Sequence, residues 1–187
     1  MRRRRVSLVS CLLVVCGSLF VARHVSASPI CESSLPFNID AGALKSELID
    51  LLQGSATFRR QCARVAATQV LRVTVRVGVS VGVGGRAQTI IQRYDAGGLR
   101  AEVTLAFGED YVELLAHEFE HILEQVDGVR LSAEVAAGRA WLTASGAFET
   151  RRAFDAGARA RHEYEASAAG AVHADGRKPP AGRLAFR

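Results

Sequence analysis

Aromatic residues are scarce in this sequence, and cysteines and net charge nearly disappear once its amino terminus is set aside. Phenylalanine, tyrosine and tryptophan make up 6% of the 187 residues, whereas hydrophobic residues as a whole reach 49%. Such a chain can bury one sizeable core but is too short for two ordinary domains. No internal repeat is visible, so an array of repeated units is excluded. We therefore expect one domain with additional segments at both ends.

The segment 1–27 is typical of a secretory signal peptide. Arginines at 2–5 precede an apolar run over 6–22, and Val25-Ser26-Ala27 forms a small-residue cleavage site. The run is shorter than the roughly 20 residues that a membrane span needs. We expect an exported protein, periplasmic or secreted, with no membrane association after cleavage. A retained membrane anchor is the alternative.

The rest of the chain carries no net charge. Five of the 24 basic residues and none of the 19 acidic residues lie in the first 27 positions, which leaves 19 of each sign. The basic pI therefore comes largely from the export signal, and nucleic acid is not an expected partner. Arginines within 59–100 are interpreted as solvated outward positions of a sheet. Binding of an anionic polymer by these arginines is the alternative.

Two cysteines remain after cleavage, Cys31 and Cys62. In an exported protein such a pair is more often a disulfide than a metal site. We predict a bond between them, which would stabilise the fold by roughly 3–4 kcal/mol in the chain-entropy model.

The spacing of apolar residues predicts an α+β fold. Helical spacing occurs over 40–55 and 56–68, and strand-like alternation occurs over 70–84, 86–94 and 99–107. Short glycine-containing turns between these strands favour an antiparallel meander within a small antiparallel or mixed sheet. Two helices are expected to pack on this sheet, over about 110–126 and 147–167, the first capped by Asp110 and Glu113. The expected domain covers 28–168, and the Gly-, Pro- and Ala-rich segment 169–187 is expected to be a disordered tail.

The helix over 110–126 contains His117-Glu118-Phe119-Glu120-His121. Two imidazoles at i and i+4 can bind one ion, and the residue after the first can direct a carboxylate at the water that the ion activates. With five His and 12 Glu in the chain, this spacing is expected by chance only about 0.01 times. The alternative is an exposed, charged helix whose histidines bind nothing.

These five residues resemble the HExxH motif of zincin metallopeptidases, and the strand that leads into the motif helix is similar to the arrangement in that family. The resemblance covers about 70–165, and only the motif is specific. It implies one Zn²⁺, a peptide or protein substrate, an edge strand that binds the substrate backbone, and Glu118 as general base. Glu120 is charged where the extended pattern usually has an uncharged residue, and we expect its side chain to reach solvent. Segment 148–163, FETRRAFDAGARARHE, is similar to small exported bacterial proteins of uncharacterised function.

A catalytic zinc ion needs a third protein ligand. The gluzincin branch of the family uses a glutamate on a later helix, and Glu149 lies 28 residues beyond His121. We predict Glu149 as the third ligand, with Asp127 and Glu134 as alternatives. The aspartate that usually orients a histidine in that branch is absent, because its position is Ala153.

Tyr164 is a candidate hydrogen-bond donor to the oxyanion of the transition state, and packing in the core is its alternative role. These residues together predict an exported zinc metallopeptidase. The alternative function is a non-catalytic zincin-like domain in which the metal is structural or the surface binds a partner.

Overall fold

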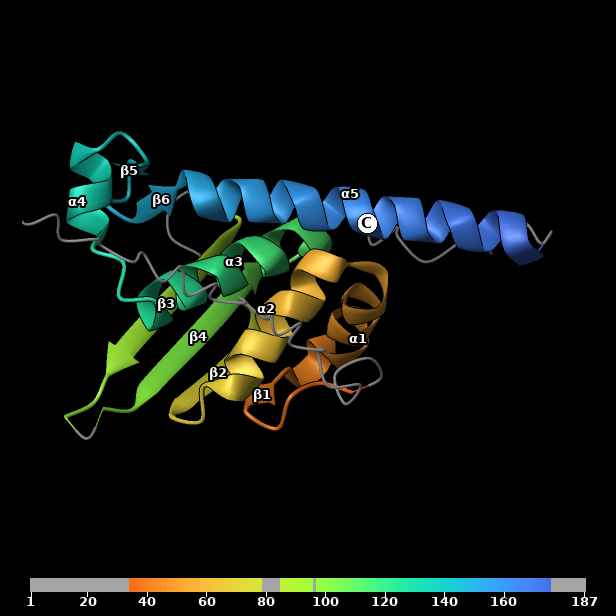
Figure 1. Cartoon of the computed structure of the whole chain (residues 1–187), viewed down its shortest axis with the longest axis horizontal. Coiled ribbons are helices and arrows are strands. Elements are labelled where there is room, and N and C mark those ends of the chain that lie inside the picture. Colours follow the sequence, from red (N-terminus) through yellow and green to blue (C-terminus); the bar gives the residue numbers. More distant parts are fainter. Residues whose placement is uncertain (1–33, 79–84, 96, 176–187) are drawn as a thin grey trace, which may run out of the picture.

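The fold combines five α-helices with two sheets in the part of the chain that the structure, a computed structural model, describes: residues 34–78, 85–95 and 97–175. This agrees with the predicted α+β class (Figure 1). The elements in chain order are β1 (Ile39–Asp40), a 3-10 helix η2 (Gly42–Leu44), α1 (Lys45–Gly54), α2 (Ala56–Ala67), β2 (Leu71–Gly78), β3 (Ala87–Arg93), β4 (Leu99–Ala106), α3 (Tyr111–Val126), α4 (Leu131–Ala136), β5 (Ala140–Leu142), β6 (Phe148–Thr150) and α5 (Arg151–Asp175).

The larger sheet has the strand order β1-β2-β4-β3, so the predicted antiparallel meander is wrong. β4 lies between β2 and β3, parallel to the first and antiparallel to the second. The expected hairpin between β3 and β4 is present, because the Tyr94 N–H donates to the Gly98 carbonyl at 3.0 Å. Turn residues identify consecutive strands but not the edge at which each strand joins. Burial decides that question: alternate residues of β4 are fully enclosed, whereas β3 is partly exposed throughout and suits an edge.

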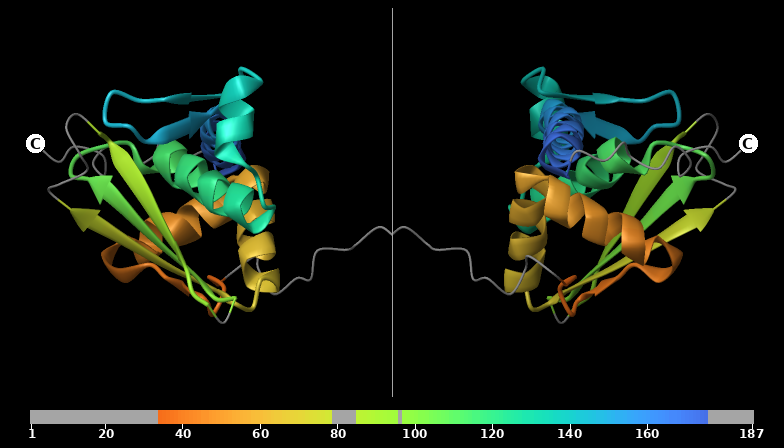
Figure 2. Two further views of the ribbon diagram at one scale, coloured as in Figure 1. Left: turned by 90° about the vertical axis from the view of Figure 1, so that its left-hand side faces the viewer. Right: turned by 90° about the vertical axis from the view of Figure 1, so that its right-hand side faces the viewer.

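One face of this sheet carries the core. Alternate aliphatic residues of β2 and β4 point inward, against α1, α2 and α3, which cover this face (Figure 2). Arg72, Arg76 and Arg100 point outward and are exposed, as the sequence predicted. The residues at the centre of the core include Leu48, Phe58, Val75, Val103, Phe119 and Leu123.

Helices α3 and α5 pack against each other in antiparallel directions, with Arg152 beside Glu120 and Arg161 beside Glu113. Small residues make the close approach possible. A methyl group at Gly157 would lie 2.9 Å from the Glu113 carbonyl oxygen and 3.2 Å from the Cβ of His117. The backbone of α5 therefore lies directly against the first histidine of the motif.

Helices α3 and α5 both lie where the sequence predicted helices, but α5 has different ends. Asp110 caps α3 by accepting a hydrogen bond from the Val112 N–H, and Gly128, with φ 71°, follows its carboxyl end. Helix α5 begins at Arg151 and continues to Asp175, so residues 169–175 are helical rather than part of a disordered tail. Residues 176–187 lie outside the described residues.

Two predictions concern the amino-terminal segment. Cys62 is buried in α2, but Cys31 and the signal peptide lie outside the described residues, so the disulfide and the export signal stay predictions. Within the described residues, none of the helices has the length and apolar character of a membrane span.

Candidate metal centre

Three side chains converge from two segments that are distant in sequence. His117 and His121 lie one turn apart on α3, and Glu149 comes from β6. The Nε2 atoms of the histidines are 3.1 Å apart, and the Glu149 Oε2 lies 3.0 Å from the first and 3.6 Å from the second. Bond lengths of 2.0–2.1 Å in a tetrahedral zinc site imply ligand separations of about 3.3–3.4 Å. The donor types and their spacing therefore fit one such ion.

Glu149 lies in strand β6 and not on the last helix, contrary to the prediction. β6 pairs with β5 in a short antiparallel hairpin, in which Trp141 is opposite Glu149 and Ala140 is opposite Thr150. α5 begins directly after this strand. Strands of three residues contain too few positions to show a period of two, so the helical pattern that follows seemed to include Glu149.

A second carboxylate orients His121 from its other nitrogen. Glu124 is buried on α3, and its Oε2 lies 3.0 Å from the His121 Nδ1. The hydroxyl of Thr150 donates to the other oxygen of Glu124 at 2.6 Å and accepts the Ala153 N–H at 3.0 Å. A carboxylate on Nδ1 leaves Nε2 available to a metal and makes it a stronger ligand. The sequence does indicate this contact, because Glu124 lies three residues after His121 and therefore on the same face of the helix.

Glu118 lies beside the histidines and is only 5% exposed. Its Oε2 accepts a hydrogen bond of 2.5 Å from the hydroxyl of Thr89 on β3. Burial raises the pKa of Glu118, and the hydrogen bond from Thr89 opposes this effect only in part. The motif glutamate is therefore held between α3 and the edge strand of the sheet, as a carboxylate with increased proton affinity.

Groups that favour opposite charges lie close together among these residues. Burial would lower the pKa of His121, but its hydrogen bonds with Glu124 and Glu149 outweigh burial and raise it from 6.5 to about 10. Burial would raise the pKa of Glu149, but hydrogen bonds from His117 and His121 outweigh it and lower this pKa from 4.5 to about 2. Glu124 and Glu149 thus favour a positive charge on or beside His121, and a bound divalent cation would also supply one.

No protein-family model, curated protein or solved structure matched this chain. The resemblance to zincins rests on the motif, and the site is interpreted from the chemistry of its own residues.

Glu120 does not reach solvent, contrary to the prediction. Its carboxylate is enclosed between three helices: Oε1 accepts from the Arg152 Nε at 2.6 Å and Oε2 accepts from the Gln61 Nε2 at 2.7 Å. The position of Glu120 within the motif does not show that α2 and α5 also cover α3. An ion pair with Arg152 offsets the cost of burying the charge.

The two alternative third ligands are engaged elsewhere. Asp127 ends α3 and pairs with Arg64 and Arg152. Glu134, on α4, pairs with Arg139 at 2.6 Å. The group of residues whose donor atoms lie within 4.8 Å of one another contains neither of them.

Tyr164 is not brought to this group. It lies on α5 seven residues beyond Gly157, which faces His117, and this spacing corresponds to about 10 Å along the helix axis. Its ring packs over Gly54 of α1 and joins the core. Burial raises the pKa of Tyr164. The structure supports the packing role for this tyrosine.

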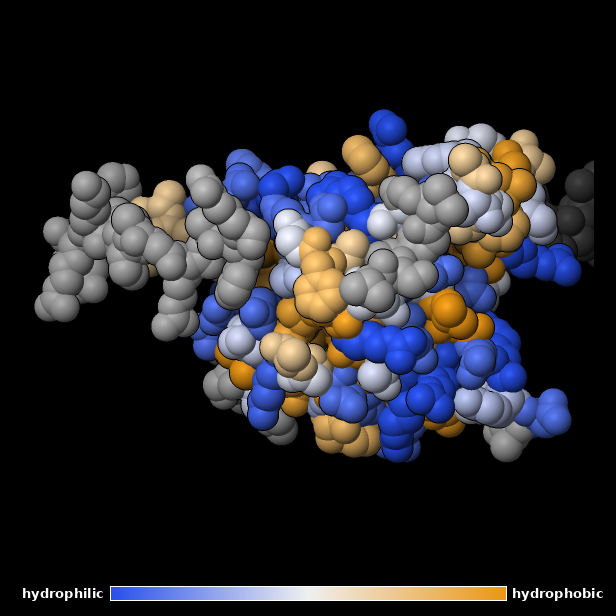
Figure 3. All heavy atoms as spheres, turned by 180° about the vertical axis from the view of Figure 1, so that it is seen from behind, coloured by the Kyte–Doolittle hydropathy of each residue, from blue (hydrophilic) through white to orange (hydrophobic). Residues whose placement is uncertain are grey.

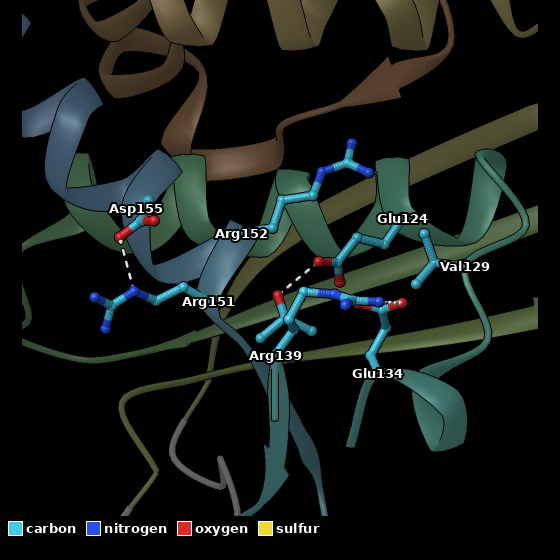
Figure 4. A pocket seen from close by; sticks show the side chains of 8 residues that line it. Glu124, Val129, Glu134, Arg139, Arg151, Arg152 and Asp155 are labelled. Atoms are coloured by element: carbon cyan, nitrogen blue, oxygen red, sulfur yellow. Dashed lines mark hydrogen bonds and ion pairs between the residues drawn. The ribbon is translucent and has the colours of Figure 1, made fainter. Parts of the chain in front are cut away.

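A hollow of about 410 Å³ is lined by Glu124 and Thr150 but by neither histidine. Figure 4 shows Glu124 pointing into it from α3, and Arg139 and Arg151 beside it. Both arginines are already paired, Arg139 with Glu134 and Arg151 with Asp155. We therefore assign no ligand to this hollow.

Proposed function

We propose that this protein is an exported zinc-dependent metallopeptidase in which His117, His121 and Glu149 hold one zinc ion and Glu118 is the general base. The observation that carries the proposal is the convergence of three ligand-type atoms, separated by 3.0, 3.1 and 3.6 Å, beside a buried carboxylate. A site with three protein ligands leaves one coordination position for water or substrate.

When bound, zinc supplies Lewis-acid activation of water and of the scissile carbonyl group. Glu118 accepts the proton of the attacking water and transfers it to the nitrogen of the leaving amine. In the absence of a metal, burial raises the pKa of Glu118 above that of a solvated glutamate. Thr89 fixes the orientation of this carboxylate.

The edge strand supports a peptide as substrate. β3 is the terminal strand of the sheet and pairs with β4 along one side. In the part of the chain that the structure describes, no strand pairs with its other edge, and an extended peptide would add there by backbone hydrogen bonds. Thr89, in the middle of β3, places this edge next to Glu118.

The test compares zinc content and peptide hydrolysis in four forms of the chain. We expect about one zinc per wild-type chain by elemental analysis, and loss of that zinc in His117→Ala and in Glu149→Ala. Glu118→Gln should keep zinc but lose about 10²–10⁴-fold in kcat, because it removes the base and not a ligand. Glu165→Gln, an exposed glutamate on α5, is the matched control. Full activity in Glu118→Gln, or no zinc in the wild-type chain after reconstitution, would contradict the proposal.

A non-catalytic metal site is the second candidate function. The network from His121 through Glu124 to Thr150 joins the β5–β6 hairpin to α3, as a structural metal would also do. Zinc binding without hydrolysis of any peptide in a random library would favour this candidate over the peptidase.

A further inference from the structure

Large apolar side chains are exposed around the third metal-binding residue. Trp141, Leu142, Phe148 and Phe154 are 44%, 56%, 39% and 50% exposed, and all lie close to Glu149 in sequence. Apolar side chains also gather at the upper right of Figure 3, over the end of the molecule that carries α4 and the hairpin. An exposed apolar group of this size next to a polar site is typical of a binding surface.

The pairing of the hairpin places Trp141 on the same side as the metal centre. Trp141 and Glu149 are direct partners in the antiparallel ladder. Such partners point to the same face, with their Cβ atoms about 4.5–5.5 Å apart. The side chain of Trp141 therefore projects from the same face of the hairpin that Glu149 uses to reach His117. The next pair, Leu142 and Phe148, points to the opposite face of the hairpin.

The two histidines lie between this hairpin and the edge strand. The hairpin supplies Glu149, and β3 holds Glu118 through Thr89. Figure 2 shows the β5–β6 hairpin and β3 as neighbouring segments on the same side of the molecule. A peptide that pairs with β3 and presents a bond to the histidines therefore has Trp141 on its other side.

The charges near the hairpin do not suit a charged substrate side chain. Arg139 is bound by Glu134, and Arg151 lies 3.6 Å from Asp155. Among the exposed apolar residues of the hairpin, Trp141 is the one that shares a face with Glu149.

We propose that Trp141 determines substrate specificity, by packing against an aromatic or large aliphatic side chain next to the scissile bond. The substrate class is therefore peptides with such a residue at this position. The inference rests on the proposed function, because it assumes that a peptide lies at the metal centre. The indole offers a rigid apolar face to this side chain, and contact with an aromatic ring adds to the gain from burial.

The experiment measures binding of two small metal-directed probes to the zinc-loaded chain by calorimetry. The probes are phenylalanine hydroxamate and glycine hydroxamate, which share the zinc-binding group and differ in the apolar side chain. We expect the wild-type chain to bind the phenylalanine compound roughly tenfold to hundredfold more tightly. Trp141→Ala should remove this preference, and Trp141→Phe should retain most of it. Leu142→Ala is the matched control, because it truncates an exposed apolar residue on the other face of the same strand.

Fluorescence gives a second measurement that needs no variant. The chain has one tryptophan, so its emission reports on Trp141 alone. The phenylalanine compound should shift this emission more than the glycine compound does. Equal affinities of the two probes, or an unchanged preference in Trp141→Ala, would overturn the inference and leave the metallopeptidase proposal in place. Failure of both probes to bind and absence of zinc would instead refute the proposed function.

Discussion

His121 is contacted by a carboxylate at each of its two ring nitrogens. Glu124 lies 3.0 Å from Nδ1, and Glu149 lies 3.6 Å from Nε2. The first carboxylate is buried and fixed by Thr150, whereas the second is partly exposed. Under the proposed function, this difference in environment suits the first carboxylate to orientation of the ring and the second to binding of the metal.

Replacing Thr150 by valine tests this assignment without changing the side-chain volume much. The substitution removes the hydroxyl that donates to Glu124 and caps α5 at Ala153. We expect zinc affinity to fall about tenfold and the free energy of unfolding to fall by about 1 kcal/mol. Competition with a fluorescent chelator measures the affinity. Thr143→Val, which removes a hydroxyl from the turn of the same hairpin, should leave it unchanged.

The stability of the metal-free chain should depend on pH through His121 and Glu149. The folded-state pKa of His121 is raised to about 10, so its contribution is complete below 6.5 and is lost as the pH rises through about 10. The folded-state pKa of Glu149 is lowered to about 2, so its contribution is present above 4.5 and is lost as the pH falls through about 2. The two contributions are therefore largest together between about pH 4.5 and 6.5.

Urea denaturation in the presence of a chelator checks this pH dependence. We expect the metal-free chain to be more stable at pH 6 than at pH 9.5, by about 1–3 kcal/mol. Glu149→Gln should reduce this difference, because one of the carboxylates that raise the pKa of His121 is then replaced by a neutral amide. The same difference in both proteins would contradict the role of Glu149.

The grouping of His117, His121 and Glu149 was easier to predict from the sequence than the surroundings of these residues. His117, Glu118 and His121 could be identified because their spacing depends only on the helix period. Glu149 was identified from its distance along the chain. The burial of Glu120 depends on α2 and α5, which pack on α3 only in the folded molecule. No local pattern encodes such contacts.

At the scale of the element, the contact between α3 and α5 positions the first histidine. Gly157 allows the contact, since any side chain there would press on the Glu113 carbonyl and on His117. α5 also follows β6 without a loop, so a displacement of α5 would move Glu149. The spacing of these two helices thus controls two ligands together.

Gly157→Ala should therefore weaken both stability and zinc binding. We expect a loss of about 1–3 kcal/mol in the free energy of unfolding, because the two helices must separate. Zinc affinity should fall as well, and chelator competition would measure it. Gly170→Ala is the control, since nothing lies within 4 Å of a methyl group at that exposed helical position. It should be neutral or stabilising by up to about 1 kcal/mol.

Elements with long periodic patterns were predicted, and the shortest strands were not. α3 and the alternating strands β2 and β4 contain enough positions to show their period. β5 and β6 have three residues each and went unnoticed, as did the two-residue strand β1. The order of strands in the sheet also escaped prediction, because it depends on which strand takes a hydrogen-bonded neighbour on each edge.

At the scale of the whole molecule, a metal at this site would join the buried core to the β5–β6 hairpin, whose residues are mostly exposed. The residues of the larger sheet that face the helices are buried in the core. The β5–β6 hairpin consists mostly of exposed residues and contacts α3 through Glu149 and Thr150. Its order should therefore depend on the metal much more than the order of the sheet does.

Hydrogen exchange followed by mass spectrometry checks this dependence. Removal of zinc should increase exchange in peptides that cover 138–150 and leave peptides from β2 and β4 nearly unchanged. Zinc should also raise the melting temperature, since it binds the folded chain in preference to the unfolded chain. A uniform increase in exchange over the whole chain would contradict a separate response of the hairpin.

The position of β4 between β2 and β3 has a consequence for the order of folding. β3 and β4 are joined by a short turn and can pair within about 1–10 μs, as isolated hairpins do. β2 gains its main partner only when Leu71 meets Leu99, which is 28 residues away. Closing that longer loop is slower, so we expect β2 to dock onto a hairpin that already exists. Glu149 and α5 come later still in the sequence, and the metal centre would then be the last part of the molecule to form.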